Sequence, residues 1–178
     1  MFFKNQAQLR PVLPDEETSL AMYEMAIERL ESMGLRRYEI SAFAEPGYES
    51  KHNTGYWTGR PFLGLGPSAY SYWEGKRFRN IAHLKRYCDM LKNGQFPIDF
   101  EEELDPAAAR RELFVIRLRL REGVDLAKFQ RDYGELDPEM FAVINRLVQE
   151  NYIKTESGVI RLTHKGVLFY DTVAVELI

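Results

Sequence analysis

One segment of the chain, residues 38–72, fits neither of the two regular hydrophobic patterns. It mixes aromatic side chains with a histidine and several glycines, and it lacks both the alternation of a strand and the spacing of an amphipathic helix. Glycine lets a bound molecule approach the backbone closely, and aromatic rings offer flat apolar faces. The segment therefore predicts a binding site for a flat or phosphorylated ligand.

Composition limits the kinds of site that this chain can build. The 178 residues are 45% hydrophobic, which suffices for a buried core, and no apolar run is long enough to span a bilayer. The first ten residues lack the apolar region of a signal peptide, so we expect a cytoplasmic protein. Cys88 is the only cysteine, which excludes an intrachain disulfide and any multi-cysteine iron–sulfur site within the chain.

The charges are nearly balanced, with 24 basic and 27 acidic residues, and this gives no general attraction to nucleic acid or acidic membranes. Two local runs stand out, and we interpret both as solvated faces. The basic run contains Lys76, Arg77, Arg79, Lys85, Arg86 and Lys92. The acidic run contains Asp99, Glu101, Glu102, Glu103 and Asp105. Residues 99–104 are predicted to be a connector between two domains.

The first part of the chain has an α/β pattern. An acidic start at residues 14–17 predicts a helix that ends at Gly34, and residues 37–43 and 62–65 read as strands. A further helix is expected over residues 81–93, with Cys88 buried in its apolar stripe.

The second part combines helices with a hairpin. Asp105-Pro106 and Asp137-Pro138 each pair a capping residue with proline at the first helical position. A short helix ending at Gly134 lies between these two helices, a hairpin turns at residues 157–158, and Thr163 is placed to cap a last helix. This is the order of a winged helix. From Asp105 onward the chain has eleven basic and twelve acidic residues, which disfavours the nucleic-acid binding that such a fold suggests.

Each of two short motifs within residues 38–72 has two possible interpretations. The motif GLGPSA, residues 64–69, follows an expected strand. Its glycines suit either a tight turn or the close approach of a nucleotide-like ligand. The run HNTGYW, residues 52–57, places an imidazole beside two large aromatics. His52 is either a haem ligand or a surface histidine next to core aromatics.

Several motifs together resemble one family. The chain contains YEIS, FA and PG before the HN-xx-YW run, then FLGLGPSA, with LPDEE before the first helix and LT-xx-G at residues 162–166. These motifs resemble the oxygen-independent coproporphyrinogen III oxidase-like radical SAM family, and within it the branch of HemW-type haem chaperones. The resemblance covers practically the whole chain.

The resemblance implies a fold and a place within a longer parent protein. It implies an α/β plus α+β chain: residues 1–98 as the C-terminal part of a radical SAM partial (β/α) barrel, then the 99–104 connector, then a winged-helix-like domain at residues 105–178. Family members hold a [4Fe–4S] iron–sulfur cluster with three cysteines and bind S-adenosylmethionine to it. This chain has no such motif, so we expect a C-terminal fragment that has no radical activity of its own.

The resemblance also implies roles for individual residues. Those implied to lie near S-adenosylmethionine are Gly64, Gly66, Ser68, Glu39 and Ser41. Those implied to lie near haem are His52, Asn53, Tyr56 and Trp57, together with Tyr70, which stands where many relatives have histidine. No metal ligands are expected within the fragment.

The implied function is a fragment of a haem chaperone that binds haem and delivers it to an acceptor protein. The alternative is a fragment of oxygen-independent coproporphyrinogen III oxidase, which converts coproporphyrinogen III to protoporphyrinogen IX. A nucleic-acid-binding winged helix is the third and least favoured hypothesis. Because a partial barrel leaves strand edges unpaired, we expect a homodimer through the barrel edge as one outcome.

Overall fold

The computed structural model describes residue 9 and residues 12–178. The residues used above as evidence against a signal peptide, apart from residue 9, lie outside this range. The described chain forms two compact units that meet in sequence between Glu49 and Ser50. No helix among the described residues is both long enough and apolar enough to cross a membrane.

The first unit contains one long helix and a very short hairpin. Helix α2 (Glu16–Ser32) begins as predicted, because the Asp15 side chain accepts a hydrogen bond from the Thr18 N–H at 2.8 Å. Strand β1 (Arg36–Arg37) pairs antiparallel with β2 (Phe43–Ala44).

The prediction of a single strand over residues 37–43 is wrong, because the chain reverses direction within this run. The Tyr38 N–H donates to the Ala42 carbonyl at 3.1 Å. The Glu39 carboxylate accepts from both the N–H and the hydroxyl of Ser41, at 3.0 and 2.9 Å. A local side-chain hydrogen bond thus stabilises a turn where the alternation of side chains suggested a strand.

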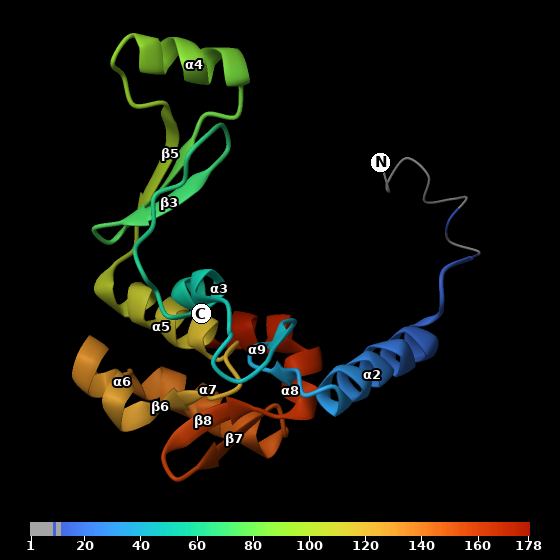
Figure 1. Cartoon of the computed structure of the whole chain (residues 1–178). Helices are drawn as coiled ribbons and strands as arrows, with labels where there is room; N and C mark the ends of the chain where they lie inside the picture. Colours follow the sequence, from blue (N-terminus) through green and yellow to red (C-terminus); the bar gives the residue numbers. More distant parts are fainter. Residues whose placement is uncertain (1–8, 10–11) are drawn as a thin grey trace. The chain divides into compact units, whose positions relative to one another are not determined.

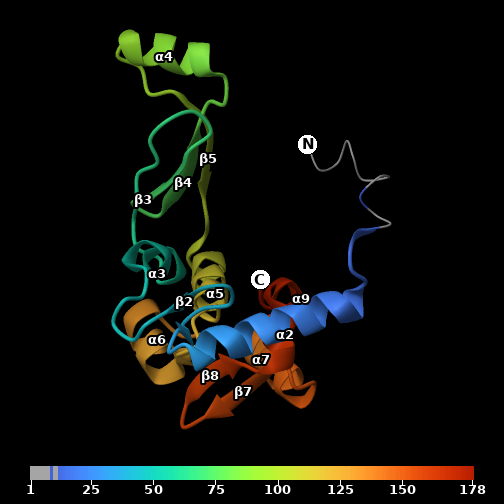
Figure 2. The ribbon, with the colours of Figure 1, turned by 45° about the vertical axis from the view of Figure 1, so that its right-hand side comes forward.

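The second unit begins with an arm built on an antiparallel sheet. After α3 (Lys51–Trp57), strands β3 (Tyr70–Trp73), β4 (Lys76–Asn80) and β5 (Ile98–Glu103) pair in the order β3-β4-β5. Helix α4 (Leu84–Lys92) connects β4 to β5. Figures 1 and 2 both show α4 at the end of this sheet that is distant from helices α5 to α9.

Two predictions for the sheet of the arm need correction. Of residues 62–65 only Phe62 pairs, in an isolated bridge with Tyr72, because side chains rather than a strand take up the backbone groups that follow. The acidic run is not a connector but strand β5, since its carboxylates lie opposite the basic residues of β4. Among the described residues, these carboxylates form ion pairs across the sheet: Lys76–Glu101, Lys76–Glu103, Arg77–Glu102 and Arg79–Asp99.

Helix α4 is shorter than predicted, and its apolar stripe is not buried. The helix starts at Leu84 because the His83 imidazole accepts from the Arg86 N–H. Leu84 is 65% exposed and Leu91 is 49% exposed. Cys88 is only partly buried, so its predicted role as a core residue is wrong.

The remaining elements follow the predicted order closely. Their bounds are α5 (Pro106–Arg117), β6 (Val124–Asp125), α6 (Leu126–Tyr133), α7 (Pro138–Gln149), β7 (Ile153–Glu156), β8 (Val159–Leu162), α8 (His164–Leu168) and α9 (Tyr170–Leu177). Both Asp-Pro signals start helices, and Gly134 ends α6. The hairpin turns at Ser157 and Gly158, both with positive φ, as predicted. The single last helix that we expected is divided into α8 and α9 at Phe169.

The core of the second unit lies between α5, α6, α7, α9 and the β6-β8-β7 sheet. The rings of Phe114 and Phe129 meet edge to face, with centroids 5.4 Å apart, and both side chains are fully buried. Other side chains of this core are Val115, Leu118, Met140, Ile144, Leu147, Ile153, Ile160, Val173 and Leu177. This packing fixes α5, one wall of the site described below.

Asp137 has two roles, and this gives a prediction about acid stability. It caps α7 by accepting from the Met140 N–H and also accepts from Arg111, and these hydrogen bonds lower its pKa below the ordinary value of 3.8. A carboxylate with a lowered pKa stabilises the fold above pH 3.8, and this contribution is lost as the pH falls below 3.8. Asn also caps helices, so Asp137→Asn removes mainly the charge.

We therefore expect Asp137→Asn to lower the melting temperature at neutral pH and to differ less and less from the parent chain as the pH falls below 3.8. Thermal unfolding followed by circular dichroism across this range measures the difference. Asp132→Asn, at a carboxylate that caps no helix, is the control. A difference between the parent and Asp137→Asn that stays constant with pH would contradict the assigned role.

Candidate functional site

His52 lies on a short helix rather than on a loop. The Ser50 hydroxyl accepts from the Asn53 N–H at 3.3 Å and caps α3, which holds the motif His52 to Trp57. His52 lies in the first turn and is exposed, whereas Asn53, Tyr56 and Trp57 are partly buried. The helix thus presents the imidazole to solvent and turns the two large aromatics toward the rest of the unit.

The aromatic rings of this motif form a continuous series. The His52 and Tyr56 rings meet edge to face at 4.7 Å, and Tyr56 meets Phe62 in the same way, also at 4.7 Å. The Trp57 ring lies under the guanidinium of Arg119 at 4.2 Å, in cation–π geometry. His52 therefore occupies the outer end of a packed aromatic series, and its orientation is fixed by Tyr56.

The glycine loop is held by a buried asparagine. The Asn80 side chain is 8% exposed, and its amide donates to the carbonyls of Gly64 and Gly66 at 3.1 and 3.0 Å. A Cβ at Gly64 would lie 2.1 Å from the Tyr70 carbonyl oxygen, and Gly66 has a φ of +102°. These two glycines are required by a close backbone approach and by an unusual backbone conformation.

The N–H groups of the glycine loop are already used within the chain. The Gly64 N–H donates to the Ser71 hydroxyl at 3.0 Å, and the Gly66 N–H donates to the Tyr87 hydroxyl at 3.1 Å. The Ser68 N–H donates to the Asn80 carbonyl at 3.1 Å. A ligand at this loop would therefore meet exposed side chains, including that of Ser68, rather than a nest of free backbone donors.

The other predicted residues lie in different surroundings. Tyr70 is exposed on β3, with the Arg79 guanidinium 5.8 Å from its ring centroid and with Phe100 beside it. Glu39 and Ser41 belong to the first unit, where they are hydrogen-bonded to each other in the turn between β1 and β2.

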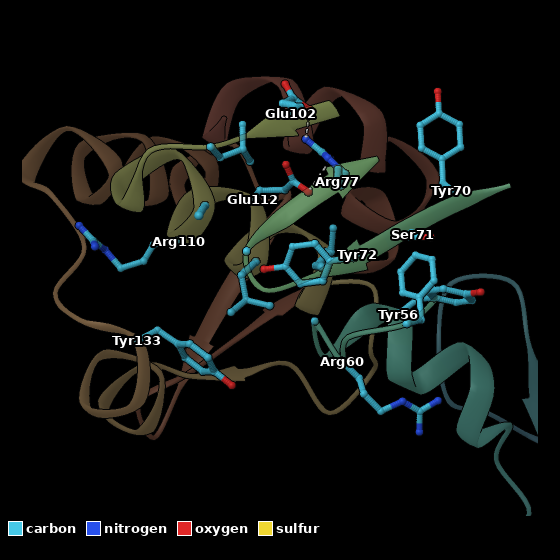
Figure 3. A pocket seen from close by; sticks show the side chains of 17 residues that line it. Tyr56, Arg60, Tyr70, Ser71, Tyr72, Arg77, Glu102, Arg110, Glu112 and Tyr133 are labelled. Carbon is cyan, nitrogen blue, oxygen red and sulfur yellow. Dashed lines mark hydrogen bonds and ion pairs between the residues drawn. The ribbon is translucent and has the colours of Figure 1, made fainter. Parts of the chain in front are cut away.

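A cavity of about 320 Å³ lies within the second unit, and the sequence analysis did not find it. Figure 3 shows side chains from α3, β3, β4, α5 and α6 around it. Its apolar lining comes from Tyr56, Phe62, Tyr72, Leu104, Leu113, Ile116 and Tyr133. These residues are spread over nearly eighty positions, so no local pattern could have revealed the cavity. The aromatic content of residues 56–72 was its only sequence signal.

The charged groups at this cavity differ in whether they have partners. Arg77 donates to Glu102 at 2.7 Å and to Glu112 at 2.8 Å, so this cluster of one cation and two carboxylates keeps one negative charge in excess. Arg60 and Arg110 also line the cavity, and neither forms an ion pair within the described part of the chain. The cavity therefore combines apolar walls with two cations that can bind an anion.

Comparisons with known proteins find similar sequences. Residues 104–169 match the HemN C-terminal domain. The chain is 32% identical over 174 residues to the heme chaperone HemW of Bacillus subtilis, covering 97% of this chain and 46% of that protein. It is 35% identical over 115 residues to HemW of Mycobacterium tuberculosis, covering 65% of this chain and 30% of that protein. The chain is therefore similar to HemW proteins over nearly its whole length and to the HemN C-terminal domain over residues 104–169.

A solved structure shows the same fold. The chain matches the coproporphyrinogen III oxidase HemN from Escherichia coli, described as a radical SAM enzyme, with a TM-score of 0.74 and 18% sequence identity. The match covers 93% of this chain and 42% of that one. This chain thus spans less than half the length of the relatives that it matches.

The residues present do not fit an iron–sulfur cluster. Such a cluster needs several thiolates, and the chain has one cysteine. In the described part of the chain, no three His, Cys, Asp or Glu residues are grouped so that they could hold a metal ion.

The clamp at Asn80 gives a prediction about the glycine loop. We expect Asn80→Ala to lower the free energy of unfolding by about 1–3 kcal/mol, because two buried carbonyls lose their donor. Urea unfolding measures this loss, and hydrogen exchange should show faster exchange at Gly64, Gly66 and Ser68. Asn93→Ala, at the exposed end of α4, is the control. Unchanged exchange in the loop would show that Asn80 does not hold it.

Proposed function

We propose that this chain is the C-terminal part of a haem chaperone, a protein that binds haem and passes it to an acceptor protein. The observation that carries the proposal is the exposed His52 at the outer end of the His52–Tyr56–Phe62 ring series. Histidine is a common axial ligand of haem iron, and adjacent aromatic rings suit a flat macrocycle. The similarity to HemW proteins over nearly the whole chain supports the same conclusion.

The architecture of the parent is part of this proposal. Residues 1–98 would contribute the last part of a partial (β/α) barrel, and residues 105–178 a winged-helix domain. The order α5, β6, α6, α7, β7, β8 and the sheet order β6-β8-β7 support the winged helix. The similarity to HemN supports the placement of the whole segment within such a protein.

The cluster and S-adenosylmethionine belong to the parent in this proposal. We keep Gly64, Gly66, Ser68, Glu39 and Ser41 as proposed contacts to S-adenosylmethionine, with side chains and carbonyls as the contacting groups in the glycine loop. The chain alone supplies no ligand set for a cluster, so we expect it to have no radical activity. The proposed capture of haem uses only side chains of this chain. We also propose a cytoplasmic location.

The proposed partners are a haem-acceptor protein and a second copy of the chain. The parent would meet a haem-acceptor protein, and the open edges of the β3-β4-β5 sheet, together with the exposed Leu84 and Leu91, suit a homodimer. Nucleic acid is not proposed. Helix α7, the position of a recognition helix, has Glu139 and Glu150 at its ends, and its Arg146 is paired with Glu176.

A fragment of oxygen-independent coproporphyrinogen III oxidase is the second candidate. The matches to the HemN C-terminal domain and to the HemN fold favour it. An anaerobic assay of the full-length parent with a reconstituted cluster distinguishes the two candidates. Decarboxylation of the propionates of coproporphyrinogen III would favour the oxidase, and haem transfer without turnover would favour the chaperone.

The test of the haem site uses all three histidines of the chain. We expect titration of the unsubstituted chain with haem to give a Soret shift, and we expect His52→Ala to abolish it because the iron loses its axial ligand. His83→Ala and His164→Ala should titrate like the parent chain. Circular dichroism checks that α3 and the rest of the fold persist. A Soret shift that survives in His52→Ala would remove His52 from the site.

A further inference from the structure

The cavity of the second unit has walls of two kinds. On one side lie Tyr72 and Phe62, which pair with each other through their backbones. On the other side lie Leu113 and Ile116 of α5, with Tyr133 of α6 beside them. The Tyr133 hydroxyl accepts from Arg117 at 2.7 Å, and the Arg117 guanidinium lies over the Tyr133 ring at 4.8 Å. This wall of the cavity is therefore fixed in place.

The cations at the rim are long side chains that can adjust to a ligand. Arg60 follows α3 and is exposed, and Arg110 lies in the first half of α5. Figure 3 shows the Arg110 and Arg60 side chains on opposite sides of Tyr72, with both guanidinium groups pointing away from it. Arg77 lies between Glu102 and Glu112, which hold it in the wall. The rim therefore has two guanidinium groups that form no ion pair within the described part of the chain, and together they exceed the one unbalanced negative charge of the Arg77 cluster.

We propose that this cavity binds the carboxylate-bearing edge of a porphyrin, with Arg60 and Arg110 as the groups that recognise the propionates. This inference rests on the proposed function for the identity of the ligand. The two propionates of haem lie side by side on one edge of a flat apolar ring, and both arginine side chains would have to turn toward that edge to reach them. Arginine is the side chain best suited to carboxylates, because its planar fork can donate two parallel hydrogen bonds.

The size of the cavity agrees with partial insertion. At about 320 Å³ it lies at the lower end of the range for small-molecule sites. It can take one edge of a macrocycle between Tyr72 and the aliphatic side chains of α5, with the rest of the ring outside. Tyr56 lines the cavity and also contacts His52, so one tyrosine side chain connects the imidazole to the cavity.

The experiment separates this recognition from iron coordination by using a porphyrin without iron. Protoporphyrin IX and its dimethyl ester differ only in the two carboxylates, and fluorescence titration measures the binding of each. One variant, the double substitution Arg60→Gln and Arg110→Gln, removes both rim cations. Arg86→Gln, at an exposed arginine of α4 outside the cavity, is its matched control.

A second variant tests the position of the ligand without changing charge. Ala109 lines the cavity on α5, so Ala109→Phe fills part of it. Ala127→Phe, at an exposed position of α6, is the matched control. Thermal unfolding of all variants shows whether each is folded before its binding is interpreted.

We expect the double arginine variant to bind protoporphyrin IX about tenfold or more weakly than the unsubstituted chain does. Both should bind the dimethyl ester equally well, because the ester has no carboxylate. Ala109→Phe should weaken the binding of both porphyrins, and the two control variants should weaken neither. Equal binding of protoporphyrin IX by the parent and a folded Ala109→Phe would overturn the position of the site. Equal loss of acid and ester in the double variant would overturn the role of the arginines.

The outcome for the proposed function is read separately. His52→Ala should weaken the binding of iron-free protoporphyrin IX far less than it weakens the binding of haem, because protoporphyrin IX has no iron to coordinate. Porphyrin binding that requires the cavity, combined with a haem Soret shift that does not require His52, would contradict the haem site and leave the cavity assignment in place. If the unsubstituted chain shows the haem Soret shift but binds no protoporphyrin IX, the assignment of the cavity is overturned and the haem site is left in place.

Discussion

Arg77 connects the two parts from which the second unit is built. From strand β4 it reaches Glu102 on the neighbouring strand and Glu112 on helix α5. One guanidinium thus joins the arm to the helical part of the unit, and the cavity lies where they meet. A single exposed ion pair contributes little to the free energy of unfolding. The role of these two pairs is to hold strand β4 against strand β5 and helix α5. The orientation of Tyr72 relative to Leu113 depends on this junction.

The features that could be predicted from sequence are those that a few neighbouring residues determine. Asp105 and Asp137 cap their helices with their own side chains, and each is followed by proline, so the signal and the structure lie within four residues. The turn at Ser157 and Gly158 is equally local. For these elements, tertiary packing agrees with the local preference and does not override it.

The features that could not be predicted depend on residues far apart in the chain. The basic run of β4 and the acidic run of β5 each look like a solvated face, yet they are the two sides of one ladder. Residues between them form α4, and nothing local to either run shows that the two meet. The cavity is the same case at a larger scale, because Tyr56, Arg77 and Tyr133 come together only in the fold. His52 differs in that it became a site candidate from its local residues, an imidazole beside two large aromatics, and from a family motif, and the structure then placed it on a helix.

The short helix α3 explains how a surface histidine and an interior cavity can belong to one site. Its cap at Ser50 fixes where the helix starts, and one helical turn then separates His52 from Tyr56. The same spacing sets the imidazole against one side of the tyrosine ring, while Phe62 contacts the ring from the cavity wall. A ligand that met both the imidazole and the cavity would lie along the Tyr56 side chain. In the proposed function this ligand is haem, and none of the proposed contacts needs a cysteine thiolate.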